Sequence, residues 1–180
     1  MNGSVSLDGY SAGPNVSEEH PMGEGGERLH QWLFAEGSDG DAAFAATVGA
    51  VVLGRRTFDL GLPHWEDTPF PAPSFVLTHE ERPPLAMKSA AFTFVTDGPE
   101  SAVAQARAAA GDKDVLVMAA AESARHVLRA GLVDEIRLQL VPVLLGGGAR
   151  LLDGLPPAEF ERIEATAADD VVHLRFRALR

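Results

Sequence analysis

Residues 50–57 read Ala-Val-Val-Leu-Gly-Arg-Arg-Thr, which predicts a buried strand, a glycine turn and the start of a helix. A strand that is apolar at every position is typical of a parallel sheet covered on both faces. Gly54 lets the backbone turn, and the amides that open a helix favour an anion. Arg55 and Arg56 add fork-shaped donors that suit phosphate, while the Thr57 hydroxyl either caps the helix or donates to a diphosphate. The alternative is a capped helix that carries two solvated arginines.

Apolar, β-rich runs alternate with alanine-rich runs on both sides of this segment. Further strands are predicted at residues 5–7, 74–77, 92–95, 115–118 and 136–140. Helices are predicted at 27–35, at 41–48 with Asp41 as cap, at 97–110 with Asp97 as cap, and at 123–130. Residues 13–26, rich in glycine and proline, are predicted to form a loop. Near the C-terminus, Val172, Leu174 and Phe176 alternate with polar residues, which predicts one buried face and a hairpin with residues 160–166. We therefore expect a single α/β domain over residues 1–180, with a mostly parallel sheet, helices on both faces and an antiparallel C-terminal hairpin.

Composition excludes several classes of function. The 180-residue chain is 46% hydrophobic and 23% charged, as in globular proteins, and it contains no cysteine for disulfides or thiolate metal sites. Its six histidines show no metal-ligand spacing, so we expect no metal site. The net charge of −11 argues against nucleic acid as a partner. Without an apolar run of about 20 residues or a signal-like start, the chain is expected to be cytoplasmic and not to enter a membrane.

Three other predicted strand ends carry residues that could contact a ligand, because ligands of open α/β sheets bind outside the carboxyl ends of the strands. Asp8 follows the first strand, in Leu7-Asp8-Gly9, and could hydrogen-bond a substrate; the alternative is an aspartate that serves its own turn. Thr78 and His79 follow another strand and could line the same pocket as residues 54–57, or simply form a turn. Ala119-Ala120-Ala121 is the third such end.

Four motifs in order resemble one known family. They are Ser6-Leu7-Asp8-Gly9-Tyr10, Leu53-Gly54-Arg55-Arg56-Thr57-Phe58, Phe75-Val76-Leu77-Thr78, and the run from Ala130-Gly131-Leu132-Val133-Asp134-Glu135-Ile136 to Pro142-Val143-Leu144-Leu145-Gly146-Gly147-Gly148. Over essentially the whole chain, the sequence resembles the dihydrofolate-reductase-like proteins that share a fold with the reductase domain of the riboflavin-biosynthesis protein RibD.

This resemblance implies an NADPH site, hydride transfer to a pterin-, pyrimidine- or similar heterocyclic substrate, and a homodimer, for which the apolar segment 141–145 adds some support. By family analogy, Gly54, Arg55, Arg56 and Thr57 would meet the cofactor phosphates, and Thr78 and His79 would lie near the adenosine 2′-phosphate. Asp8 and Trp65 would border the substrate and nicotinamide side. Residues 144–148 would form part of the pocket rim.

Two departures from the family pattern leave the reaction open. Relatives typically carry a glycine pair, joined by a cis peptide, where this chain has Ala119-Ala120 before Ala121, so each added Cβ takes room near the phosphates. The first long helix offers Glu27 at its start but no carboxylate in its middle, which argues against an authentic dihydrofolate reductase. We expect a stand-alone reductase of unassigned substrate. The alternatives are a non-catalytic ligand-binding dimer that has lost the cofactor site, and a protein that binds flavin or another aromatic ligand in the same cleft.

Overall fold

The computed structural model describes residues 1–34, 42–168 and 170–179, and these form two compact units. Unit 1 comprises Met1–Ser38 and Ala119–Arg180, and unit 2 comprises Asp39–Met118. The expected helix cap at Asp41 lies outside the described residues. The prediction of a single domain over residues 1–180 stays a prediction, and each unit is described below in its own right.

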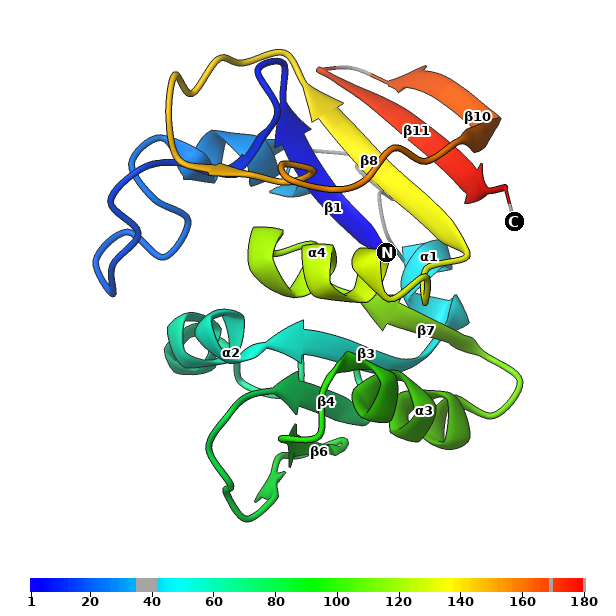
Figure 1. Cartoon of the computed structure of the whole chain (residues 1–180). Coiled ribbons are helices and arrows are strands. Elements are labelled where there is room, and N and C mark those ends of the chain that lie inside the picture. Colours follow the sequence, from blue (N-terminus) through cyan, green and yellow to red (C-terminus); the bar gives the residue numbers. More distant parts are fainter. Residues whose placement is uncertain (35–41, 169, 180) are drawn as a thin grey trace. The chain divides into compact units, whose positions relative to one another are not determined.

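Unit 2 is built on a five-stranded sheet in the order β5-β6-β4-β3-β7 (Figure 1). Its elements are α1 (Ala42–Thr47), β3 (Val48–Gly54), α2 (Arg55–Gly61), η2 (Leu62–His64), β4 (Ser74–Leu77), β5 (Leu85–Ala86), β6 (Ala91–Val95), α3 (Pro99–Ala110) and β7 (Asp114–Val117). The strands β6, β4, β3 and β7 pair in parallel, and only β5 runs antiparallel to its neighbour.

The central strand β3 is covered on both faces, as its uninterrupted apolar sequence predicts. The side chains of residues 50–53 are all 0% exposed. Val51 and Leu53 join a core cluster that includes Phe58 of α2, while α3 packs against β3, β4 and β7. Burial on both sides fixes the register of β3 and therefore the place where its carboxyl end delivers Arg55.

Unit 1 contains a four-stranded sheet in the order β1-β8-β11-β10, with the strands side by side in Figure 1. Its elements are β1 (Asn2–Ser6), β2 (Tyr10–Ala12), η1 (Gly26–Phe34), α4 (Ala121–Arg129), β8 (Glu135–Val141), β9 (Ala149–Arg150), β10 (Phe160–Ala168) and β11 (Val171–Ala178). β1 and β8 are parallel, β11 and β10 are antiparallel, and β2 pairs separately with β9. The predicted C-terminal hairpin is therefore confirmed.

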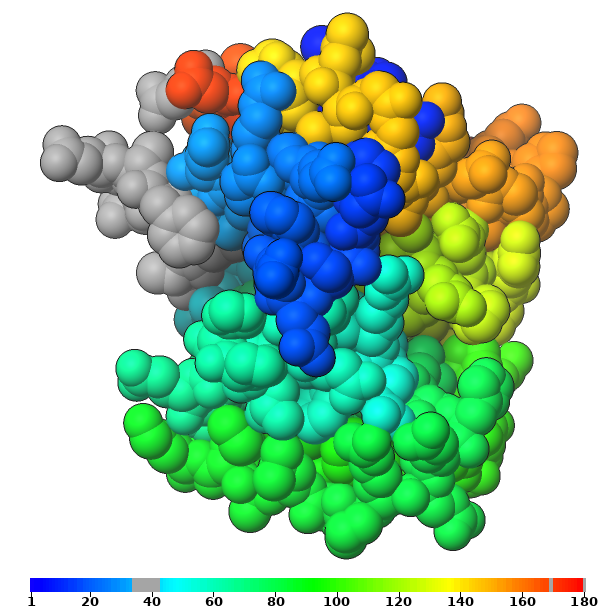
Figure 2. Space-filling view, turned by 90° about the vertical axis from the view of Figure 1, so that its left-hand side faces the viewer, coloured from blue at the N-terminus to red at the C-terminus, as the bar shows by residue number. Residues whose placement is uncertain are grey.

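The loop predicted at residues 13–26 from its glycines and prolines is an irregular segment of unit 1 up to Gly25, and Gly26 begins η1. It lies at the surface in the space-filling view, where it is coloured blue (Figure 2). The helix predicted after it is a 3₁₀ helix, η1, whose Leu29 is fully buried against Val141 and Val171. Among the described residues, no helix combines the length and apolar character that crossing a bilayer requires.

Three local expectations were wrong. Helix α2 begins at Arg55 with Gly54 at its N-cap, so Thr57 lies inside the first turn and does not cap the helix. Helix α3 is preceded by Gly98 rather than capped by Asp97, because the backbone there has a φ of 96°, which glycine adopts most readily. The face of β11 that carries Val172, Leu174 and Phe176 is half-exposed and not buried, and the neighbouring strand β10 is exposed along its whole length.

Candidate functional site

The carboxyl ends of three parallel strands meet at one edge of unit 2. Gly54 at the end of β3 pairs with Leu77 of β4, and Leu77 in turn pairs with Val95 of β6. The residues that follow, Arg55 and Thr78, therefore emerge at the same edge of the sheet. The structure therefore brings the end of β3 and the end of β4 to one edge, and the expectation that Gly54–Thr57 and Thr78–His79 line one pocket there stays a prediction.

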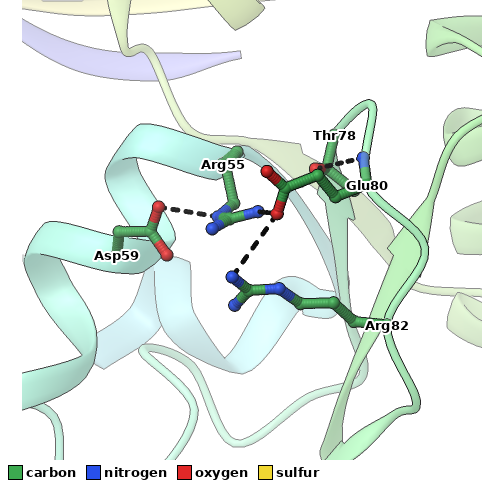
Figure 3. Close-up of polar contacts among 5 residues, drawn as sticks. All are labelled: Arg55, Asp59, Thr78, Glu80 and Arg82. Carbon is green, nitrogen blue, oxygen red and sulfur yellow. Dashed lines mark hydrogen bonds and ion pairs between the residues drawn. The ribbon is translucent and has the colours of Figure 1, made fainter.

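Arg55 holds two carboxylates at this edge (Figure 3). Its Nε donates to Asp59 Oδ2 at 2.6 Å, one turn further along α2, and its Nη1 donates to Glu80 Oε2 at 2.8 Å. Hydrogen bonds to Glu80 and then to Asp59 raise the pKa of the Arg55 guanidinium above its ordinary value. The same contact with Arg55 lowers the pKa of Glu80, so both groups are fully charged at neutral pH.

Glu80 is tied to the end of β4 as well as to Arg55. Its backbone amide donates to Thr78 Oγ1 at 3.1 Å, and its Oε2 lies 3.5 Å from Arg82 Nη2. The Arg82 guanidinium lies 5.8 Å from the centre of the Phe94 ring on β6, within the range of a cation–π contact. Two arginines and two carboxylates thus form one cluster, and His79 is exposed beside it.

Sequence reasoning missed three members of this cluster. Asp59 could have been found, because it stands four residues after Arg55 on a predicted helix, which is the spacing of a helical ion pair. Glu80 and Arg82 carried no such signal, since their approach to Arg55 depends on how β3 pairs with β4. Helix α2 has only seven residues, so its dipole adds little to anion binding at this edge.

Trp65 packs into the core of unit 2. Its ring stacks on Phe92 with a centroid distance of 6.1 Å and an interplanar angle of 13°. A side chain at Gly61 would collide with the same ring, so the absence of a Cβ there makes the stacking possible. Trp65 is half-buried, and its assignment to the substrate side stays a prediction.

In unit 1, Asp8 is held by its own turn and by the segment 144–148. Ser6 Oγ donates to Asp8 Oδ1 at 2.6 Å, and the amides of Leu145 and Gly146 donate to its two oxygens at 3.2 and 2.8 Å. The Ser6 hydrogen bond above all, with those of Gly146 and Leu145, lowers the pKa of Asp8 to about 2 against a smaller opposing effect of desolvation. The carboxylate therefore fixes a glycine-rich segment predicted to form a pocket rim.

Ala119 turns its methyl group toward the interior of unit 1. Its amide donates to the Asn2 carbonyl at 3.0 Å, and a side chain at Gly3 would collide with its Cβ. The methyl packs against a cluster of Val5, Ala124 and Leu151. Ala120 is extended, with φ −84° and ψ 132°, and stands at the N-cap of α4, in which Ala121 is the first residue. No peptide bond in the described residues is cis.

Comparison with known proteins places this geometry in a family context. The family model described as the RibD C-terminal domain matches residues 1–174. No curated protein matches the chain significantly in sequence.

Solved structures share the fold. A putative riboflavin biosynthesis protein from Shewanella sp. PV-4 is 24% identical, with a TM-score of 0.80, covering 99% of this chain and 97% of that one. The Thermotoga maritima diaminohydroxyphosphoribosylaminopyrimidine deaminase/5-amino-6-(5-phosphoribosylamino)uracil reductase is 14% identical, with a TM-score of 0.64, covering 99% of this chain but 55% of that one. The Enterococcus faecalis dihydrofolate reductase complexed with NADP(H) is 14% identical, with a TM-score of 0.58, covering 98% and 94%.

Proposed function

Because the chain belongs to the RibD C-terminal domain family, we propose that it is a reductase that passes a hydride from NADPH to a flat heterocyclic substrate, such as a pterin or a pyrimidine. One observation carries the proposal: parallel pairing of β3 with β4 places Arg55 and Thr78 at one edge of unit 2. The family resemblance adds Gly54, Arg56, Thr57 and His79 to the same binding role.

The donors at this edge suit the phosphates of a dinucleotide. A guanidinium presents paired N–H groups that match phosphate oxygens, and the Thr78 hydroxyl is both a donor and an acceptor. Both carboxylates on Arg55 are more exposed than the arginine itself, at 45% for Asp59 and 67% for Glu80 against 25%. An incoming phosphate can therefore replace a carboxylate without disturbing the core.

The bound nicotinamide would supply the hydride, and the chain would supply position and electrostatics. We propose that Asp8 acts by ordering residues 144–148 rather than by exchanging a proton, because its carboxylate accepts three hydrogen bonds and its pKa is lowered to about 2. Trp65 would border the substrate and nicotinamide side, and Ala119, Ala120 and Ala121 would lie near the cofactor diphosphate; both assignments rest on the family resemblance.

Calorimetric titration of the whole chain with NADPH and NADH tests the proposal. The variant Arg55→Ala should weaken NADPH binding about ten- to a hundredfold and NADH binding less, because a hydrogen bond to a charged group contributes about 1.5–3 kcal/mol. Arg162→Ala, an exposed arginine on β10, is the control and should change neither affinity. Failure of the native chain to bind NADPH at millimolar concentration would refute the cofactor assignment.

The neutralised Arg55 also favours a second candidate, a ligand-binding protein that keeps the fold without turnover. Asp8, the acid predicted near the substrate, is occupied by hydrogen bonds within unit 1. Loss of NADPH absorbance at 340 nm, the wavelength at which the reduced nicotinamide absorbs, would be measured with a panel of pterins and pyrimidines. Oxidation with any member identifies a reductase, whereas binding without oxidation across the panel supports the second candidate.

A further inference from the structure

In the cluster of Arg55, Asp59, Glu80 and Arg82, a carboxylate already occupies the end of the Arg55 guanidinium to which a phosphate would bind. Asp59 occupies Nε of Arg55, whereas Glu80 occupies Nη1, at the end of the guanidinium fork (Figure 3). Arg55, Arg82, Asp59 and Glu80 together carry no net formal charge. An arginine neutralised in this way attracts an anionic ligand less than a free one would, because each carboxylate repels the incoming charge.

The two carboxylates differ in how they are held. Asp59 stands on the same helix as Arg55, four residues further on, so its contact orients the guanidinium as long as α2 is folded. Glu80 comes from the segment after β4, its side chain is 67% exposed, and its backbone is held through its amide, which donates to Thr78 Oγ1. Exposed ion pairs are weak, so the Glu80 carboxylate can leave Arg55 without loss of the fold.

A second arginine, Arg82, lies close enough to pair with the Glu80 carboxylate when that carboxylate leaves Arg55. The Nη2 of Arg82 already lies 3.5 Å from the Glu80 oxygen that contacts Arg55. Contact with the Phe94 ring keeps the Arg82 guanidinium near the sheet edge. Replacement of Glu80 on Arg55 by another anion would therefore leave no carboxylate unpaired.

We propose that Glu80 competes with the 2′-phosphate of the cofactor for Arg55 and thereby sets how strongly the chain prefers NADPH over NADH. This inference rests on the proposed function. It assumes that the dinucleotide binds at this edge of unit 2 and that its 2′-phosphate, proposed to lie near Thr78 and His79, is also within reach of Arg55, because the strand ends that carry Arg55 and Thr78 are paired. NADPH displaces the Glu80 carboxylate from Arg55, and that carboxylate then pairs with Arg82. NADH has no 2′-phosphate and leaves that ion pair in place.

The test compares Glu80→Gln with Glu81→Gln in the full chain. Both variants remove one negative charge from the same exposed segment, but only Glu80 contacts Arg55. Calorimetry would measure the affinities of NADPH, NADH, 2′,5′-ADP and 5′-AMP. Glu80→Gln should raise the affinity for NADPH and 2′,5′-ADP about five- to tenfold, given the strength of exposed ion pairs and of nearby like charges. Its effect on NADH and 5′-AMP should be within about twofold, and Glu81→Gln should have the smaller effect on every ligand.

The possible results distinguish a failure of the Glu80 competition from a failure of the cofactor site. An equal gain for Glu80→Gln and Glu81→Gln, or an equal gain for NADPH and NADH, would overturn the competition while the cofactor site stands. Binding of none of the four nucleotides to the native chain or to Glu80→Gln would overturn both the cofactor site and the competition. Far-ultraviolet circular dichroism of Glu80→Gln confirms that any change in affinity belongs to a folded chain.

Discussion

Asp8 makes the stability of unit 1 depend on pH. Hydrogen bonding lowers its pKa from 3.8 to about 2 in the folded chain, so the folded state binds the proton less readily than the unfolded state. The stabilisation is complete above the unfolded pKa of 3.8 and is lost as the pH falls through about 2. We expect Asp8→Asn to melt below the native chain at pH 7 and the difference in Tm to shrink toward pH 2.

Differential scanning fluorimetry across pH 2–7 measures this difference. Asp153→Asn, at an exposed position in the same unit, is the matched control and should track the native chain throughout. A gap between Asp8→Asn and the native chain that stayed constant with pH would show that the carboxylate charge does not stabilise the segment at 144–148.

Gly3 lies against Ala119, and the contact is possible because Gly3 has no Cβ where the Cβ of Ala119 lies. A methyl group at Gly3 would meet Ala119 Cβ, so Gly3→Ala should destabilise unit 1 by about 1–3 kcal/mol, the usual effect of overpacking. Adding Ala119→Gly to that variant removes the collision and should recover most of the loss. Urea unfolding of the two single variants and the double variant measures the coupling. Strictly additive effects would contradict the contact.

At the scale of elements, Glu135 joins two neighbouring strands of unit 1. Its oxygens accept from Arg175 Nη2 at 2.7 Å and from Arg177 Nη2 at 3.1 Å, linking the start of β8 to β11. Burial raises the pKa of the Glu135 carboxyl, but the hydrogen bonds from the two arginines outweigh burial and lower it. Glu135→Gln should therefore destabilise the chain by about 0.5–1 kcal/mol at pH 7, since it leaves two arginines adjacent.

The effect of Glu135→Gln should be smaller at pH 3 and in high salt, because a lowered pKa stabilises the fold only while the carboxyl is charged. Chemical unfolding at the two pH values, with and without salt, measures it. Glu159→Gln, at an exposed position just before β10, is the control. Equal destabilisation at both pH values would assign the effect to packing instead.

Elements with an unambiguous apolar pattern could be predicted from the sequence. The predicted strands at 74–77 and 92–95 correspond to β4 and β6 within one residue, because both are short, mostly apolar runs bounded by turn residues, as buried parallel strands are. Helix starts were harder, since Asp97 has a good capping side chain but the neighbouring Gly98 supplies the backbone conformation. The contact between Glu80 and Arg55 could not be predicted, because it follows from strand pairing between distant residues.

At the scale of the whole molecule, the resemblance to the family predicts a homodimer, and β10 offers one place for it. In the part of the chain that the structure describes, β10 pairs only with β11 and ends the sheet. All nine residues of β10 are exposed, and Phe160 and Ile163 are among them. The free edge of β10 offers backbone N–H and C=O groups to a second chain, and Phe160 and Ile163 offer apolar contact between the charged residues of the strand.

We therefore expect light scattering to give twice the chain mass of 19.1 kDa. Ile163→Lys should shift the protein toward monomer, because it replaces an apolar contact of the proposed interface by a charge that must be desolvated on pairing. Glu164→Lys, next to it on β10, introduces the same residue without removing an apolar side chain and is the control. A native chain of monomer mass at every concentration would contradict the dimer. If both variants remain dimeric, the interface does not involve β10. Leu144, which is 67% exposed, is another apolar position to test.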